Sequence, residues 1–281
     1  MRIEQLHDPV EFATIATPLL MRDEAENCFW LGLISSPDDL AKNIMYVVRD
    51  GRGACLTIAT MTPGMQMVMP RTRIEVVHAL AGWLHAQAIA LPGIGGPRET
   101  AEAFAREWVR LTAAPTRVHV ETVVHQLTKV TPPRPAPGRM RTAEMRDIDL
   151  VAQWITSFRI EIGEGRLGDG RAIAQRRVPT GNIFLWEDDS EKIVAMTGVT
   201  GATPNGVRVN LVYTPARERG RGYASNLVAA VSQRMLDSGR KFCFLYTDLA
   251  NRTSNKIYRQ LGYEPLSESV HIMFDGPAAS H

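Results

Sequence analysis

Four prolines within eight residues divide this chain into two parts of similar length. Residues 131–138 read TPPRPAPG, with prolines at positions 132, 133, 135 and 137. Proline lacks a backbone donor and favours extended polyproline geometry, so this proline segment suits a linker better than a helix or a central strand. Residues 1–130 and 139–281 are each long enough to form their own hydrophobic core. The alternative is an ordinary proline-rich loop inside one domain.

The composition favours an ordinary globular protein, with 44% hydrophobic and 22% charged residues. The net charge of +2 is too small to indicate a nucleic acid or an anionic membrane as partner. Three scattered cysteines without a CxxC spacing disfavour a disulfide scaffold and a zinc site, and no metal is expected. The N-terminal stretch lacks a signal peptide, and no apolar run reaches 18 residues. We therefore expect a soluble, cytoplasmic protein.

The apolar spacing predicts alternating helices and strands in both halves. In the second half we expect helices at 147–162, 222–238 and 254–261, and strands at 182–186, 192–199, 207–214, 242–247 and 270–274. The first half repeats this order more faintly, with strands at 54–61, 65–69 and 118–130 and helices at 71–89 and 99–111. We interpret the glycine-rich Gly93–Pro97 as a tight turn. The fold class is therefore α/β with a mixed sheet, and the repeated order indicates two similar domains.

The segment that carries most chemical information runs from Leu211 to Ser225, LVYTPARERGRGYAS. It leads from a strand through an arginine- and glycine-rich turn into a helix. Such a turn points backbone N–H groups at one spot beside the positive end of the helix, where phosphate binds. A Walker loop needs Lys-Ser/Thr after the last glycine, and a Rossmann loop needs glycine at 225, so neither fits.

The pattern Arg219-x-x-Gly222-x-Ala224 resembles the pyrophosphate loop of the GCN5-related N-acetyltransferases, the GNAT family. A second segment is similar to a later motif of that family: a strand ending at Asn251, a helix that bears Asn255 and Tyr258, and a Gly-Tyr turn. The resemblance covers residues 147–274 and is only architectural over the first half.

The whole chain is similar to tandem-domain GNAT proteins in which a degenerate first copy precedes an intact second one. This similarity implies a degenerate domain at 1–130, a linker at 131–138 and an acetyltransferase domain at 139–281. In the first copy, Met69–Thr72 takes the place of the pyrophosphate loop and has no glycine. We therefore expect that only the second copy binds coenzyme A.

The resemblance also implies which residues contact acetyl-CoA. The backbone of one strand would pair with the pantetheine arm, through Leu211, Val212 and Tyr213. The glycine-rich turn would hold the pyrophosphate, through Arg219, Gly220, Arg221, Gly222, Tyr223 and Ala224. The second motif would contact the pantetheine or the phosphates, through Asn251, Ser254 and Asn255.

For catalysis, the resemblance places Tyr258 as the general acid that protonates the departing coenzyme A thiolate. The alternative is a half-buried core tyrosine. An amine acceptor must also lose a proton, and Glu161 is the first candidate for the base, ahead of Glu164 and Asp248. Each of these carboxylates could equally be a solvated surface charge.

The resemblance implies an acetyl-CoA-dependent N-acetyltransferase that transfers the acetyl group directly to a primary amine. The acceptor and the oligomeric state, including a homodimer, stay open. One alternative is a non-catalytic acyl-CoA-binding or regulatory module. Another is a nucleotide- or nucleic-acid-binding protein that uses Arg217, Arg219 and Arg221, which the near-zero net charge disfavours.

Overall fold

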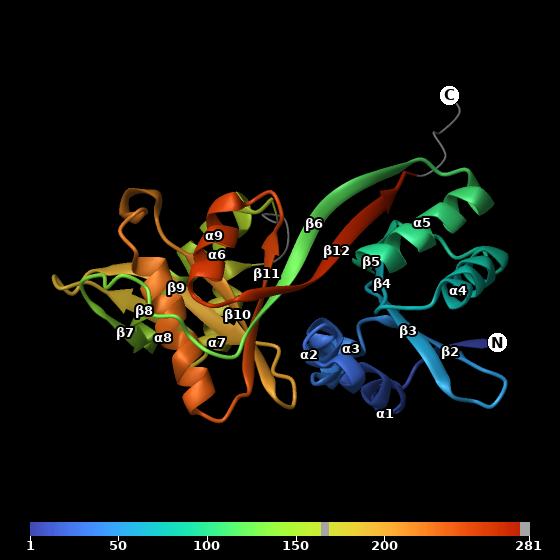
Figure 1. The fold of residues 1–281 in the computed structure, drawn as a ribbon, viewed down its shortest axis with the longest axis horizontal. Helices are drawn as coiled ribbons and strands as arrows, with labels where there is room; N and C mark the ends of the chain where they lie inside the picture. The colour runs from blue at the N-terminus through green and yellow to red at the C-terminus, as the bar shows by residue number, and fades with distance from the viewer. Residues whose placement is uncertain (164–168, 276–281) are drawn as a thin grey trace. The chain divides into compact units, whose positions relative to one another are not determined.

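The computed structural model describes residues 1–163 and 169–275 (Figure 1). The chain forms two compact units, each built from more than one stretch of sequence. The first unit contains Met1–Val124, Tyr246–Asn251 and the chain from Pro265 on, and the second contains His125–Leu245 and Arg252–Glu264. The division of the sequence at residues 130 and 139 stays a prediction.

The first unit is a mixed sheet with helices on both faces (Figure 1). Its strand order is β1 (Arg2–Leu6), β2 (Ile44–Arg49), β3 (Cys55–Met61), β4 (Met67–Val68), β5 (Gly93–Pro97), β12 (Glu264–Phe274) and β6 (Thr116–Leu127). One face is covered by α1 (Pro9–Leu20), α2 (Cys28–Ile34) and α3 (Pro37–Leu40), the other by α4 (Ile74–Ala86) and α5 (Arg98–Thr112). Strands β4 and β5 pair in parallel.

The second unit repeats this arrangement (Figure 1). Its strand order is β11 (Phe242–Asp248), β10 (Gly206–Tyr213), β9 (Ile193–Thr200), β8 (Ile183–Glu187) and β7 (Arg139–Thr142). Only β10 and β11 pair in parallel among these. One face packs on α6 (Ile148–Glu161) and α7 (Gly170–Arg177), the other on α8 (Tyr223–Asp237) and α9 (Arg252–Gln260). Each unit therefore has three layers, with apolar side chains alternating between the two faces of its sheet.

Every predicted helix and strand of both halves exists, but the interpretation of Gly93–Pro97 as a turn is wrong. These five residues are the fully buried strand β5. A Cβ on Gly93 would lie 2.5 Å from the carbonyl oxygen of Ile272, and one on Gly96 would lie 2.3 Å from that of Met69. The glycines are thus required because neighbouring strands approach closely, rather than because the chain turns. The strands β1, β2 and β7 and the helices α1 to α3 and α7 were not predicted.

The final strand of the second repeat belongs to the first unit. Strand β12 pairs antiparallel with β5, from Ser269 opposite Pro97 to Met273 opposite Gly93. In turn, residues 125–138 from the end of the first repeat and the proline segment belong to the second unit. There Thr131 N donates to Leu261 O at 2.8 Å. The two repeats have therefore exchanged strands, and each unit needs sequence from both halves of the chain.

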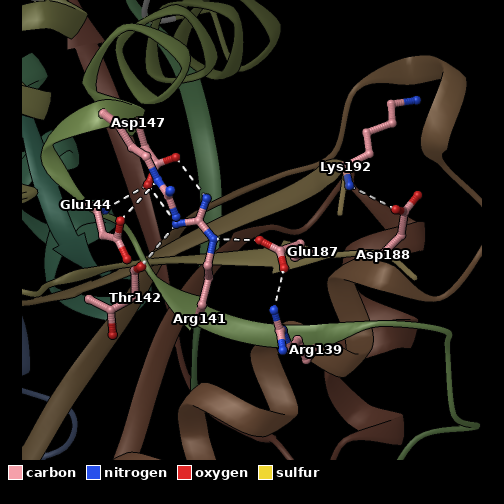
Figure 2. A network of polar contacts seen from close by, with 9 residues as sticks. Arg139, Arg141, Thr142, Glu144, Asp147, Glu187, Asp188 and Lys192 are labelled. Carbon is pink, nitrogen blue, oxygen red and sulfur yellow. Dashed lines mark hydrogen bonds and ion pairs between the residues drawn. The ribbon is translucent and has the colours of Figure 1, made fainter. Parts of the chain in front are cut away.

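A buried charge network joins β7, β8 and the start of α6 (Figure 2). Arg141 donates to both carboxylate oxygens of Asp147, at 2.7 and 2.9 Å, and its Nε donates to Glu187 at 2.9 Å. Arg139 approaches the other oxygen of Glu187, also at 2.9 Å. Asp147 in addition accepts from the backbone N of Glu144 and so completes a capping box at the beginning of the helix. Arg141 lowers the pKa of Asp147.

Within residues 1–163 and 169–275, none of the helices combines the length and the apolar character that a membrane crossing requires.

Candidate functional site

The turn between β10 and α8 has the backbone geometry of an anion-binding loop. Gly220 has φ +78° and Gly222, the N-cap of α8, has φ +83°. Side chains disfavour this left-handed region, so the two glycines are needed for the turn. The first backbone bond of the helix runs from Asn226 N to Gly222 O. The amides of residues 223–225 precede it and are not used by the helix, so they are suited to bind phosphate.

Strand β10 leads into this turn with an irregular edge. A bulge interrupts its pairing with β9 between Asn210 and Tyr213, and Leu211 has φ +52°. In the described chain, its parallel pairing with β11 runs only from Gly206 to Arg208, whereas the strand continues to Tyr213. Leu211 is buried and Val212 and Tyr213 are half-buried. The backbone of these three residues is therefore the part of β10 that β11 leaves for another extended chain.

The basic side chains of the turn are held by carboxylates. Glu218 has a side chain only 5% exposed and accepts from Lys192 Nζ and from Arg221 Nη1, the latter at 3.1 Å. These cations, Lys192 first, lower the pKa of Glu218. Arg219 Nη2 donates to both oxygens of Glu161 at 2.7 Å. The sequence predicted that these arginines belong to the site, but it did not predict Glu218, which stabilises the turn by binding Lys192 and Arg221.

The residues of the second motif lie partly before helix α9 and partly in its first turn. It begins at Arg252, so Asn251 precedes it and is part of the first unit. Ser254 and Asn255 are half-buried in its first turn. Asn255 hydrogen-bonds the fully buried His125, whose pKa burial lowers. Sequence reasoning assigned no role to this histidine, and one motif residue is thus partnered by the end of β6.

Tyr258 lies on the inner face of α9, in the apolar core that α8 and α9 form with the sheet. It is 8% exposed, and its ring meets Tyr263 edge-on at 5.9 Å between centroids. Burial raises the pKa of the Tyr258 hydroxyl well above its usual range. The phenol therefore stays protonated at neutral pH, as a proton donor must.

A cavity of about 380 Å³ borders the turn at Gly222. Its walls come from three segments that are distant in sequence: the proline segment, the first turn of α8 and the last turn of α9. They contribute Pro132, Pro133 and Arg134, then Gly222 and Ser225, then Ile257, Gln260 and Leu261. The cavity is therefore lined both by the glycine-rich turn and by the proline segment, which the sequence indicated only as a linker.

The corresponding region of the first unit is closed. Met69 N donates to Gly95 O at 3.1 Å, so β4 and β5 remain paired up to the end of β4. Arg71 donates to Glu26 and to Glu99, each at 3.0 Å or less. Carboxylates of the protein thus bind the cation that would face a phosphate.

Two other predicted residues give less information. Glu164 lies outside the described residues. Asp248 accepts from the backbone N of Ala250 at 2.7 Å, at the end of β11. Within the described chain, no three His, Cys, Asp or Glu side chains gather as a metal site.

Comparisons with known proteins agree with this geometry. Residues 149–263 match the Acetyltransferase (GNAT) family. No curated protein matches the chain. Similar solved structures include a GCN5-related N-acetyltransferase from Sphaerobacter thermophilus (18% identity, TM-score 0.64, 98% of this chain and 96% of that one). Another is a GNAT-family acetyltransferase from Colwellia psychrerythraea (10% identity, TM-score 0.64, 98% of this chain and 100% of that one). A third is a tandem GNAT protein from the clavulanic acid biosynthesis pathway (15% identity, TM-score 0.60, 99% of this chain and 100% of that one). The fold is therefore that of tandem GNAT proteins over nearly the whole chain.

Proposed function

We propose that this chain, whose residues 149–263 form a GNAT domain, transfers an acetyl group from acetyl-CoA directly to a primary amine. The observation that carries this proposal is the glycine-rich turn before α8, where two glycines with positive φ precede free helical amides. That turn adjoins the length of β10 that is not paired with β11. A phosphate site next to an open strand edge suits a ligand that combines a pyrophosphate with an extended amide-bearing arm.

In this proposal, the described residues bind the donor by their backbone more than by their side chains. The pyrophosphate accepts from the amides between Gly220 and Ala224, at the positive end of α8. The two amides of the pantetheine arm pair with Leu211–Tyr213 as an added strand would. Arg219 and Arg221 add positive charge, although each is already held by a carboxylate.

The chemical step needs one proton removed and one supplied. The amine nitrogen attacks the thioester carbonyl, the C–S bond breaks, and the coenzyme A thiolate leaves. Tyr258 is the proposed donor to that thiolate. Glu161 is the proposed base, and its pairing with Arg219 has a consequence. Arg219 donates to both carboxylate oxygens, so its turning to another anion, such as the pyrophosphate, would leave the Glu161 carboxylate open to the amine.

A calorimetric titration of acetyl-CoA into the full chain tests the binding site. We expect one equivalent to bind, because Met69–Thr72 has no glycine and β4 stays paired with β5 in the first unit. Gly222→Glu should weaken binding at least 100-fold, since it places a side chain at φ +83° and a negative charge beside the phosphates.

Gly53→Glu is the matched control. Gly53 also has a positive φ, +87°, and a Cβ there meets nothing within 4 Å. The Gly53→Glu variant introduces the same backbone strain and the same charge in the first unit. Its affinity for acetyl-CoA should equal that of the wild type. Equal affinity of the wild type and Gly222→Glu would refute the loop assignment. Thiol release across a panel of primary amines then separates an enzyme from a non-catalytic acyl-CoA-binding module, which would bind acetyl-CoA and release no thiol.

A further inference from the structure

Arg177, the last residue of α7, extends its guanidinium over the sheet of the second unit. Its Nη2 donates to Val199 O at 2.9 Å and to Asn210 Oδ1 at 3.0 Å. A Cβ on Gly198 would lie 2.6 Å from this nitrogen, so the glycine leaves the space that the guanidinium occupies. The Arg177 side chain is therefore fixed on the face of β9 and β10 that α6 and α7 cover.

Within the described chain, the Arg177 guanidinium has no anionic partner. It forms no ion pair with a carboxylate of these residues, and both of its hydrogen bonds run to neutral oxygens. Burial, followed by Coulombic repulsion from Arg208 and Arg176, lowers the pKa of Arg177 to about 10. The group thus stays charged at neutral pH. Because a half-buried cation without an anion is costly, this position favours the binding of an external anion.

Arg208 adds a second positive charge on the same face. It lies on β10 two residues before Asn210, in a regular stretch of the strand, so both side chains point to the side of α7. The two hydrogens of Arg177 Nη2 are used by Val199 and Asn210, and its Nε and Nη1 are the donors that a ligand can use. Planar guanidinium donors suit the two oxygens of a carboxylate.

These two arginines lie beside the part of β10 where the thioester is proposed to lie. Asn210 directly precedes Leu211, which has φ +52° and lies where the pairing with β9 is interrupted. In the proposed function, the pantetheine arm pairs with the backbone from Leu211 to Tyr213. An amine that attacks the thioester from the face covered by α6 and α7 therefore has the rest of its molecule near Arg177.

We propose that Arg177, assisted by Arg208, binds a carboxylate of the acceptor, so that the acceptor is a small amino acid; this rests on the proposed function. The carboxylate neutralises two cations that repel each other, and the amine at the other end of the acceptor faces the thioester. Acetyl transfer converts this amine into a neutral amide and leaves the carboxylate unchanged. Arg177 thus determines specificity and takes no part in proton transfer.

Thiol release from acetyl-CoA by the full chain tests this assignment, with glycine, β-alanine and 4-aminobutyrate compared with their carboxamides. We expect kcat/KM for the best acid to exceed that for its carboxamide about 50-fold, as a hydrogen bond to a charged group provides. Amine reactivity does not explain such a preference, because the amine of the carboxamide loses its proton more easily. O-Phosphoethanolamine compared with ethanolamine separates a carboxylate site from a phosphate site.

Arg177→Ala should reduce the preference for the acid to about threefold or less and leave the affinity for acetyl-CoA unchanged. Gly198→Ala keeps every charge but displaces the guanidinium, so it should also reduce the preference. Arg176→Ala is the matched control, since it removes an exposed arginine from the preceding position of α7, on a different side of the helix. A purely structural role of Arg177 would instead lower kcat/KM for acids and carboxamides equally.

Equal kcat/KM of the wild type for acids and carboxamides would overturn the proposal, whether or not the variants fold. An unchanged preference in Arg177→Ala would also overturn it, and a preference for O-phosphoethanolamine over every amino acid would exclude a carboxylate as the anion. Failure of the wild type to bind acetyl-CoA in calorimetry, or binding without thiol release for any amine, would instead refute the proposed function.

Discussion

At the scale of one residue, burial affects the acidity of Tyr258, the proposed proton donor. Its hydroxyl is attached to a ring enclosed by α8, α9 and Tyr263, and burial raises its pKa. Burial makes this phenol a weaker acid than a free one, so its proposed proton transfer requires the hydroxyl to hydrogen-bond the sulfur directly as the C–S bond breaks.

Tyr258→Phe should therefore lower kcat about 100-fold and leave the affinity for acetyl-CoA unchanged. Stopped-flow thiol release together with calorimetry measures both quantities. Tyr263→Phe is the control, because it removes a hydroxyl that bonds Ser232 at 2.7 Å and should affect stability rather than turnover. Equal kcat in Tyr258→Phe and the wild type would leave Tyr258 as a core residue only.

The candidate site was predictable from sequence where backbone geometry forces a residue type. Gly220 and Gly222 are identifiable because few residues adopt a positive φ. Glu218 and Asn226 were not, since Lys192 and Arg134, their partners, come from other segments that the fold brings together. A carboxylate or an amide in a sequence carries no information about a partner 92 residues away.

At the scale of elements, the stability of the junction between β7, β8 and α6 depends more on Arg141 than on Arg139. Arg141 is 18% exposed and bonds both Asp147 and Glu187, whereas Arg139 is 74% exposed and bonds Glu187 alone (Figure 2). The two side chains share a strand, a chemistry and one partner, so they form a matched pair.

Arg141→Ala should lower the free energy of unfolding by about 3 kcal/mol, because it leaves Asp147 buried without its cation. Arg139→Ala should cost far less, since water already screens its ion pair. Urea unfolding of both variants measures the difference. Similar losses in the two variants would show that burial of the network contributes little.

Local sequence patterns predicted the elements of the second half well because its helices and strands have regular apolar spacing. Strand β5 was missed since its glycines lack apolar side chains to mark it and are typical of turns. For Gly93 the reason is the backbone of β12, more than 170 positions further along the chain, and for Gly96 it is the backbone of Met69. Tertiary packing here overrides local propensity.

For the whole molecule, the ion pairs of the second unit predict how stability depends on pH. Arginine and lysine partners lower the pKa values of Asp147, Glu187 and Glu218. The folded state therefore binds protons at these carboxyls more weakly than the unfolded state does. These ion pairs contribute fully to the free energy of unfolding at a pH above the ordinary carboxyl pKa range. Their contribution is lost as the pH falls through the lowered pKa values of the folded state.

We expect the urea midpoint to be nearly constant from about pH 7 to 8, to decline below about pH 6.5 because the folded state disfavours protonation of His125, and to fall steeply below about pH 4. Asp147→Asn should be less stable at neutral pH and should show a shallower decline in acid. Circular dichroism across a pH series gives both curves. A wild-type midpoint that rises in acid would contradict the assigned ion pairs.

The strand exchange makes the proline segment a poor place to divide this protein. A gene cut between residues 138 and 139 would deprive one fragment of β12 and the other of the chain that holds His125 and Arg134. We expect neither fragment to form a complete unit alone, whereas the two expressed together contain every strand that both units need. By the same reasoning, recombination between relatives at this position joins halves that must each complete the sheet of the other.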